Sequence, residues 1–600
     1  MNCVEKLSAL RAAMKREGVD AWIVLTSDAH GTEYLPEYWR CRAWLSGFTG
    51  SAGSLVVTKD EAHLWADGRY YIQARDQLEG STITLQKMGL DGVPHLQEWV
   101  RDNLPEKAVI GIDGRTISVE LNRTFQKEFK KKKFSTRLDL DLLGEIWKDR
   151  PALPRGKAFE HDVKFAGKTR LEKLAAVREK MKTEGADCYL ISSLDDIAWL
   201  YNFRGTDTDV LPANYAYAFV TKTSAYLFID ESKLGELKTT FVNDGVQLKN
   251  YDEILPFLKS YKSAGIVTEG NVIFIDPSRT SARLLESIPE SLTVFEGHEI
   301  TARLKAQKNS VEVENLRRCY ARDCAAVAKF IKWVKEAVHR EDIEEADIHD
   351  KVHEFRKSGE NYIGPSFSTI AAYKTNAAQM HYFPVKGQSA KLKPEGFLLV
   401  DTGGHYYDGT TDITRTIVLG GISDEMKKDF TLTLKSVIRL SMAKFLYGAF
   451  GASLDVLARG VMWENGMDYK CGTGHGVGYL LNVHESPPGI RYNPTPAGLV
   501  KLEEGMVTTN EPGVYKEGRW GIRTENTLLV AKDFTNEDGT FMKFETLSFC
   551  PIDHRAIDKS LLSDGELQWL NAYHAKTYGA LSPFMNEEEK AWLREETKAL

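Results

Sequence analysis

Residues 7–25, LSALRAAMKREGVDAWIVL, are repeated in outline by residues 174–191, LAAVREKMKTEGADCYLI. In both copies apolar residues at helical spacing lead to a glycine, and a short apolar run follows. This pattern predicts a helix that ends at the glycine and then a strand, at Ala21–Leu25 in one copy and Cys188–Ile191 in the other.

A second match follows the first in the same order. The pattern Trp-Leu-x-x-Phe-x-Gly occupies residues 44–50 and recurs at residues 199–205. Two ordered matches indicate two tandem α/β domains of common design. The distance between the copies is that of a domain, so the pattern does not fit a solenoid of short repeats.

Two breaks in the pattern predict the domain boundaries. Prolines interrupt the helical pattern near Pro151–Arg155. Beyond Lys305–Ser310 the apolar residues fall on one face of a long helix, capped by Asn309 or Ser310. We therefore expect domains at 1–155, 156–308 and 309–600.

Composition and charge exclude several classes of protein. The 600 residues carry 78 basic and 85 acidic side chains, a net charge of −7, which gives no reason to expect a nucleic-acid partner. No apolar stretch is long enough to cross a bilayer, and the charged, amphipathic start does not read as a signal peptide. The seven cysteines are scattered, without a Cys-x-x-Cys pair, which favours a reducing compartment, and we expect a cytoplasmic protein.

Two aspartates in the last third stand at strand ends. Asp401 follows the apolar run 396–400, and Asp412 opens the run 413–419. The turn-rich residues 402–411 between them suggest a hairpin that brings both carboxylates to one edge.

Three more side chains in this third stand among glycines and prolines. His475 lies in Gly-Thr-Gly-His-Gly-Val-Gly, Glu511 in Asn-Glu-Pro-Gly, and Glu525 in Arg-Thr-Glu-Asn. Glycines let the backbone approach a crowded site closely.

Charge balance explains why four carboxylates would share a site with metal. Gathered carboxylates repel one another, and two divalent cations would cancel four negative charges and help a water ionise near neutral pH. Four oxygen donors against one imidazole favour manganese, with cobalt, iron or zinc as alternatives. Spacing alone does not decide between this site and separate surface or capping acids.

His349 and His353 resemble the helical pair of a zinc protease, with Asp350 in place of the usual glutamate. Aspartate is one methylene shorter than the base such a site needs. We expect instead two solvated histidines on a helix.

Residues 47–53, Gly-Phe-Thr-Gly-Ser-Ala-Gly, are rich enough in glycine to suggest a phosphate loop. They lack the Gly-Lys-Ser/Thr ending of such loops. We expect a packed turn. The run Lys130–Lys133 reads as a solvated face.

Long ordered motifs are similar to those of one known family. The chain resembles the dinuclear metallopeptidases of the pita-bread fold, and among them the three-domain aminopeptidase P, or Xaa-Pro aminopeptidase, branch. The resemblance implies an α/β (α+β) chain with two tandem creatinase-N-like domains before a pita-bread catalytic domain and its C-terminal extension. The motifs that carry it are residues 46–53, 65–70, 401, 408–416, 472–478, 482–485, 510–513, 523–526 and 569–574.

The resemblance implies a set of metal ligands. Asp412 and Glu525 would bridge two divalent ions, Asp401 would hold one of them, and His475 and Glu511 would hold the other. Glu511 would also accept a proton from the bridging water and pass it to the leaving nitrogen, so that a metal-bridging hydroxide attacks the substrate.

It also implies residues that bind substrate or orient ligands. His381 and His484 would donate hydrogen bonds to the substrate carbonyl and the oxyanion, Arg523 would orient Asp401, and Tyr515 would contact substrate. Cys471 stands where many relatives carry a histidine in the wall around the proline, so proline affinity or peptide-length preference should differ.

The implied reaction removes the first residue of a peptide with proline second. The rival activities are a prolidase that cleaves only Xaa-Pro dipeptides and a pita-bread binding module without catalysis. The family pattern also suggests a homodimer.

Overall fold

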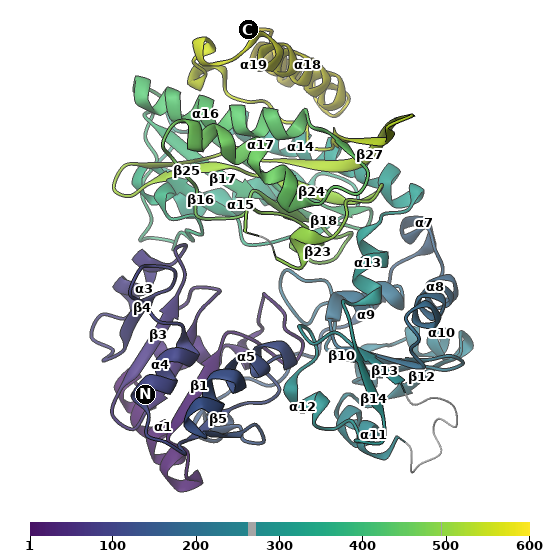
Figure 1. Ribbon diagram of the computed structural model, residues 1–600. Coiled ribbons are helices and arrows are strands. Elements are labelled where there is room, and N and C mark those ends of the chain that lie inside the picture. The colour runs from purple at the N-terminus through teal and green to yellow at the C-terminus, as the bar shows by residue number, and fades with distance from the viewer. Residues whose placement is uncertain (262–271, 494) are drawn as a thin grey trace. The chain divides into compact units, whose positions relative to one another are not determined.

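The computed structural model describes residues 1–261, 272–493 and 495–600 of the chain (Figure 1). The chain forms two compact units. Unit 1 comprises Met1–Glu160 and Lys168–Thr301, and unit 2 comprises His161–Gly167 and Ala302–Leu600. In the described part of the chain, no helix combines the length and the apolar character needed to span a membrane.

The first half of unit 1 is a six-stranded sheet that begins after the first copy of the repeat. Helix α1 (Cys3–Glu17) ends at Gly18, whose φ of 66° is the left-handed conformation that glycine adopts without strain. Strand β1 then lies between an antiparallel and a parallel neighbour. The sheet order is β4-β3-β2-β1-β5-β6, with β1 (Ala21–Leu25), β2 (Ser54–Thr58), β3 (Ala62–Ala66), β4 (Thr84–Lys87), β5 (Val109–Ile112) and β6 (Ser135–Arg137).

The second half of unit 1 repeats this sheet. Its order is β12-β11-β10-β8-β13-β14, and each pair of neighbours has the same relative direction as its counterpart in the first sheet. The shared topology confirms the repeat that the two sequence matches predicted. The strands are β8 (Cys188–Ile191), β10 (Ala216–Thr221), β11 (Ala225–Ile229), β12 (Val246–Lys249), β13 (Val272–Ile275) and β14 (Thr293–Glu296).

Helices cover these sheets. In the first half they are α2 (Cys41–Ser46), α3 (Tyr71–Gln77), α4 (Leu96–Asn103), α5 (Val119–Phe129) and α6 (Leu142–Ile146). In the second they are α8 (Arg170–Thr183), α9 (Leu194–Leu200), α10 (Leu237–Asn243), α11 (Ile254–Ser260) and α12 (Ala282–Leu285). Helix α13 (Ile300–Ala306) leads out of unit 1.

The glycine-rich segment of unit 1 is a packed turn, as predicted. The buried Arg42 guanidinium donates to the carbonyl oxygens of Phe48 and Gly50. A Cβ atom at Gly50 would overlap the ring of Phe48. The Phe48 ring therefore fills the interior of the loop, and Arg42 holds the loop backbone by hydrogen bonds.

Unit 2 begins with the long helix that the sequence predicts. Helix α14 runs over Ser310–Ala337, and the Asn309 side chain caps it by accepting hydrogen bonds from two backbone amides, those of Val311 and Glu312. The other helices of the unit are α7 (Val163–Ala166), α15 (Glu345–Lys357), α16 (Asp424–Ser441), α17 (Gly451–Glu464), α18 (Asp564–Leu581) and α19 (Glu587–Glu596).

The strands of unit 2 form several small sheets and one of six strands. The small sheets are β16-β17-β20, β15-β18-β19 and β25-β26, and the largest has the order β21-β28-β27-β24-β22-β23. Their bounds are β15 (Tyr362–Pro365), β16 (Ile370–Tyr373), β17 (Phe397–Thr402), β18 (Gly404–Tyr406), β19 (Gly409–Thr410), β20 (Ile413–Val418), β21 (Lys444–Leu446), β22 (Gly474–Gly476), β23 (Glu485–Ile490), β24 (Val507–Asn510), β25 (Gly513–Lys516), β26 (Trp520–Arg523), β27 (Asn526–Asn536) and β28 (Gly539–Thr546).

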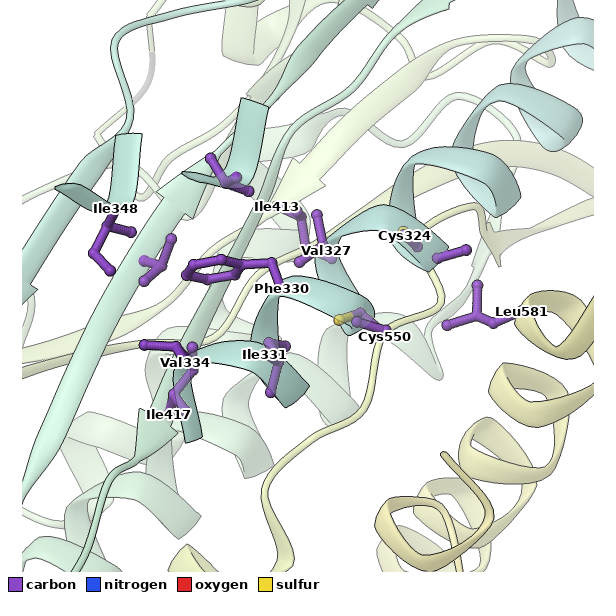
Figure 2. Packing of buried hydrophobic residues seen from close by; sticks show 14 of the residues in the cluster. Cys324, Val327, Phe330, Ile331, Val334, Ile348, Ile413, Ile417, Cys550 and Leu581 are labelled. Carbon is purple, nitrogen blue, oxygen red and sulfur yellow. The ribbon is translucent and has the colours of Figure 1, made fainter. Parts of the chain in front are cut away.

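The core of unit 2 joins α14 to the strands that lead to the acidic residues. Figure 2 shows Phe330 and Val334 of α14 packed toward Ile413 and Ile417 of β20. Ile348 of α15 belongs to the same cluster and is fully buried. This apolar contact fixes β20 against the helices, and Asp412 directly precedes β20.

The histidine pair lies on helix α15, but the prediction that both are solvated was wrong. His353 is buried, and its Nδ1 lies 2.6 Å from the hydroxyl of Tyr362. Burial, with the nearby Arg356, lowers the pKa of His353 to about 2, so it is neutral. It is a hydrogen-bonded core histidine.

Candidate metal centre

Strands β17 and β20 place the two aspartates. They pair antiparallel, with Asp401 opposite Thr414 and Thr402 opposite Ile413, so Asp401 and Asp412 come to the same end of the pair. The connection is more structured than the expected turn. Residues 404–406 and 409–410 form β18 and β19, which pair with each other, and β18 also pairs with β15 in a separate sheet.

Three adjacent strands of the six-stranded sheet carry the other acids and the imidazole. His475 lies in β22, Glu511 directly follows β24, and Glu525 directly precedes β27. β24 pairs with both neighbours. The glycine at 474 is needed for this approach, because a Cβ atom there would overlap the carbonyl oxygen of Thr509.

These side chains converge on one point. Ligand atoms of Asp412, His475 and Glu525 lie within 4.8 Å of one another. His475 Nε2 is 3.5 Å from Asp412 Oδ2 and 3.3 Å from Glu511 Oε1. Asp401 is close enough that its charge raises the pKa of Asp412. The structure thus brings together all five residues that the sequence named as metal ligands.

The hydrogen bonds of the cluster leave specific oxygens unsatisfied. Asp401 Oδ2 accepts from Arg523 at 2.6 Å, and Glu525 Oε2 accepts from Thr414 at 2.8 Å. Within the described residues, the second oxygens, Asp401 Oδ1 and Glu525 Oε1, are buried and have no hydrogen-bond donor. A buried anionic oxygen without a donor is costly. Cations held by the cluster would satisfy these oxygens, so the donor set fits a metal site.

Electrostatics lead to the same conclusion. Burial, followed by the charges of the neighbouring carboxylates, raises the pKa of Asp412 and of Glu525 well above their usual range. Burial also raises the pKa of Glu511 to about 7, although the nearby Arg523 opposes the shift. The cluster therefore holds more negative charge than the protein alone can stabilise.

Hydrogen bonds orient the single imidazole. His475 Nδ1 lies 2.9 Å from the carbonyl oxygen of Gly476, so this nitrogen carries the proton and Nε2 presents its lone pair to the acids. Thr509 links two of the ligands. Its hydroxyl accepts from the His475 amide at 3.0 Å and donates to Glu511 Oε1 at 3.2 Å.

Arg523 and Tyr515 form one unit behind Asp401. They lie on the paired strands β25 and β26, and Arg523 Nη1 donates to the Tyr515 hydroxyl at 2.7 Å. Cys471 packs in the apolar cluster beside Tyr515. The remaining face of His475 is covered by His484, whose ring meets it edge to face at a centroid distance of 4.3 Å.

His381 lies on a different segment from these residues. It follows the short 3-10 helix η5 (Lys374–Ala378) by three positions. The backbone of η5 packs directly on β26, where a Cβ atom at Gly521 would overlap the carbonyl oxygen of Ala377. The segment that carries His381 is therefore packed on the strand that carries Arg523.

Sequence reasoning did not single out the residues that hold these ligands from behind. Thr414 accepts from Arg523 Nε at 3.1 Å while it donates to Glu525, so one hydroxyl links two charged groups. The buried Arg415 donates to the backbone carbonyl of Glu525 at 2.6 Å. Both lie in the motif 408–416. The polar residues in this buried strand were the sequence feature that could have identified them.

Comparison with known proteins agrees with this geometry. Residues 314–532 match the model of metallopeptidase family M24, and residues 540–600 match the C-terminal region of that peptidase. Residues 6–139 and 149–312 each match a creatinase/prolidase N-terminal domain.

Similar proteins extend over the whole chain. The probable Xaa-Pro aminopeptidase P of Coprinopsis cinerea is 37% identical and covers 99% of this chain and 98% of its own length. Aminopeptidase P1 of Arabidopsis thaliana is 36% identical, with 99% of both chains covered. The crystal structure of X-prolyl aminopeptidase from Caenorhabditis elegans, described as a cytosolic enzyme with a di-nuclear active site, matches with a TM-score of 0.95, 33% identity and 100% coverage of both chains. The chain belongs to the aminopeptidase P (Xaa-Pro aminopeptidase) family of M24 metallopeptidases, with creatinase-like N-terminal domains before a pita-bread domain.

Proposed function

We infer that this chain is a metal-dependent aminopeptidase that removes the N-terminal residue from peptides with proline in second position. The observation that carries the inference is the largely buried cluster of four carboxylates and one imidazole, in which two buried oxygens lack donors among the described residues. The relatives that cover nearly the whole chain supply the substrate class.

We propose that Asp401, Asp412, His475, Glu511 and Glu525 hold two divalent ions, with Asp412 and Glu525 shared between them. When bound, such ions neutralise the carboxylates, activate water and polarise the scissile carbonyl. Manganese is the first candidate because oxygen ligands dominate the set, and cobalt, iron and zinc are the alternatives.

Glu511 is the proposed proton carrier. In the metal-free protein the pKa of Glu511 is raised to about 7, and its side chain is still 21% exposed, so water and substrate can reach it. A carboxylate that nucleophilic water can reach can take a proton from that water and return it to the leaving nitrogen. The leaving nitrogen of proline, like that of any peptide bond, must gain a proton before the bond breaks.

The other proposed residues bind and orient the substrate. His381 and His484 donate hydrogen bonds to the scissile carbonyl as it gains negative charge. Arg523 holds one oxygen of Asp401, which leaves Asp401 Oδ1 toward the substrate amino group and its metal. Tyr515 and Cys471 form the wall for the proline ring, which offers no N–H for recognition.

We propose the three-part division that the sequence predicted, at 1–155, 156–308 and 309–600. Each of the first two ranges contains one of the two repeated sheets. Residues 161–167 are an exception, because this stretch of the middle range belongs to unit 2.

We further propose that the chain forms a homodimer through unit 2. Exposed apolar side chains gather on α17 and the segments that contact it, namely Val456, Leu457 and Trp463 of α17, with Tyr492 and Leu499. The Trp463 and Tyr492 rings are in contact, with centroids 5.9 Å apart. Light scattering should give twice the chain mass for the wild type and the chain mass for a Leu457→Asp variant.

The proposed location is the cytoplasm. The cysteines of the described residues are free thiols, several of them buried, as expected in a reducing compartment. Cell fractionation that recovers the protein from an oxidising compartment would contradict this assignment.

Peptide turnover with added manganese tests the activity. We expect cleavage of an Arg-Pro-Pro tripeptide before the first proline, loss of activity in a chelator, and recovery with Mn²⁺. Glu511→Gln should abolish turnover, while the matched Glu504→Gln, at an exposed position on the same stretch of chain, should not. Cleavage restricted to Xaa-Pro dipeptides would indicate a prolidase, and neither turnover nor bound metal would indicate a binding module.

A further inference from the structure

Helix α15 carries a buried glutamate that is not one of the proposed metal ligands. Glu345, the first residue of the helix, is 0% exposed. Within the described residues it makes no ion pair with lysine, arginine or histidine. Its carboxylate is therefore stabilised by hydrogen bonds and by its place at the N-terminus of α15, which favours a negative charge.

Those hydrogen bonds satisfy both of its oxygens. Oε1 accepts from the Tyr373 amide at 2.6 Å and from Asn376 Nδ2 at 3.0 Å. Oε2 accepts from Asn376 Nδ2 at 3.0 Å, from the Tyr382 hydroxyl at 2.8 Å and from the Ala390 amide at 2.9 Å. All of these donors lie in residues 373–390, so one carboxylate binds both ends and the middle of this segment.

This segment carries His381. Tyr382, whose hydroxyl reaches Glu345, is the next residue in the chain, and its hydroxyl also lies 3.1 Å from Asn376 Nδ2. The residues that follow have little support of their own, since Phe383 and Val385 are exposed. Met380, on one side of His381, is buried, and the Glu345 contact with Tyr382 attaches the other side.

We propose that Glu345 is a positioning residue that holds His381 in place to donate to the substrate carbonyl. This inference rests on the proposed role of His381. Glu345 does not touch the reacting atoms. It acts through the partly buried Tyr382 hydroxyl and through η5, which hold the backbone on either side of position 381. The position of His381 matters only when the scissile carbonyl gains negative charge. Loss of Glu345 should therefore slow turnover more than it weakens substrate binding.

Glu345→Gln tests the proposal directly. The new amide places an NH₂ group against donors, so at least one hydrogen bond must be lost and the segment must shift. We expect kcat to fall about 10- to 100-fold, with KM changed less than about threefold and bound manganese unchanged. The matched control is Glu354→Gln, on the exposed face of the same helix, which should behave as the wild type.

A double-mutant cycle separates positioning from a merely structural role. We expect Glu345→Gln/His381→Asn to be no slower than His381→Asn alone within about twofold, because Glu345 acts through His381. In metal-free protein with labelled histidines, Glu345→Gln should shift the His381 ring resonance, and Glu354→Gln should leave it unchanged. If Glu345→Gln does not fold, Tyr382→Phe removes one donor and should lower kcat about three- to tenfold.

Three outcomes would overturn the proposal, and they are distinguishable. A wild-type kcat in folded Glu345→Gln, beside a slow His381→Asn, refutes only the positioning role. Independent, multiplicative losses in the double variant do the same, since they show that Glu345 does not act through His381. A wild-type rate in His381→Asn refutes the proposed role of His381 itself.

Discussion

The metal centre and the Glu345 contact are two solutions to the same problem in unit 2, a buried carboxylate. Glu345 accepts hydrogen bonds on both oxygens and needs no cation. Asp401 and Glu525 each keep one buried oxygen without a donor among the described residues. The difference separates a structural acid from a ligand. Glu345, whose two oxygens are both satisfied, holds the chain in place, whereas the open oxygens of Asp401 and Glu525 fit a role in cation binding.

The same amide substitution should have its largest effect at Glu511. Glu511→Gln removes the proton carrier and should lower kcat by about 10³-fold or more, against the 10- to 100-fold expected for Glu345→Gln. Steady-state kinetics on an Arg-Pro-Pro peptide measures both variants. Equal losses would remove the distinction between the two regions.

Stability of the metal-free protein should change in opposite directions. Glu345→Gln breaks a satisfied network and should lower the free energy of unfolding by about 2 kcal/mol. Glu525→Gln removes a carboxyl that burial and the neighbouring carboxylates make costly to ionise, and should raise the free energy of unfolding by about 1 kcal/mol in a chelator at alkaline pH, while weakening metal binding. Urea denaturation in a chelator measures both changes, and a destabilised Glu525→Gln would argue against charge repulsion in the metal centre.

The stability of the metal-free protein should fall as the pH rises. Burial raises the pKa of Glu511 to about 7 from an ordinary value of 4.5. A carboxyl whose pKa is raised by folding stabilises the fold fully below its unfolded value, and this contribution is lost as the pH rises through the folded value. We expect a loss of about 1–3 kcal/mol between pH 4.5 and 7, to which Asp412 and Glu525 add at higher pH.

The control for this pH dependence is the metal-loaded protein. Bound cations should keep the carboxylates ionised and flatten the pH dependence over the same range. Denaturation curves at pH 5 and pH 8, with manganese and with a chelator, compare the two. A metal-free protein that is more stable at pH 8 than at pH 5 would show that other groups dominate.

The smallest effect is expected in the wall beside the metal centre. Cys471 packs in the same apolar cluster as Tyr515 and lies outside the proposed set of metal ligands. Cys471→His should change KM for proline peptides about two- to tenfold and leave metal affinity unaltered. A large loss of bound metal in this variant would place position 471 in the metal centre.

Much of the architecture was predictable from local pattern. The repeated segment at residues 7–25 and 174–191 predicted two sheets of common design, and their strand orders coincide. The cap at Asn309 and the stripe after it predicted α14. The family motifs named the five side chains that converge. In each case the signal lies within a short stretch of chain.

The rest depends on contacts that no short stretch encodes. Nothing near Glu345 in the sequence marks it as an acceptor for donors at residues 373–390, because folding alone brings them together. His353 was predicted to be solvated, but it is buried, because Tyr362, which lies outside the helix, contacts its ring. Likewise, the turn-rich residues 402–411 contain two short strands, 404–406 and 409–410, and the first of them pairs with β15.

Metal titration of the chelator-treated protein tests the central claim most directly. The account predicts that calorimetry with Mn²⁺ finds two ions bound per chain, and that Asp412→Asn, which removes a shared ligand, abolishes binding of at least one. Wild-type protein that binds no divalent ion, or Asp412→Asn protein that binds two with unchanged affinity, would contradict it.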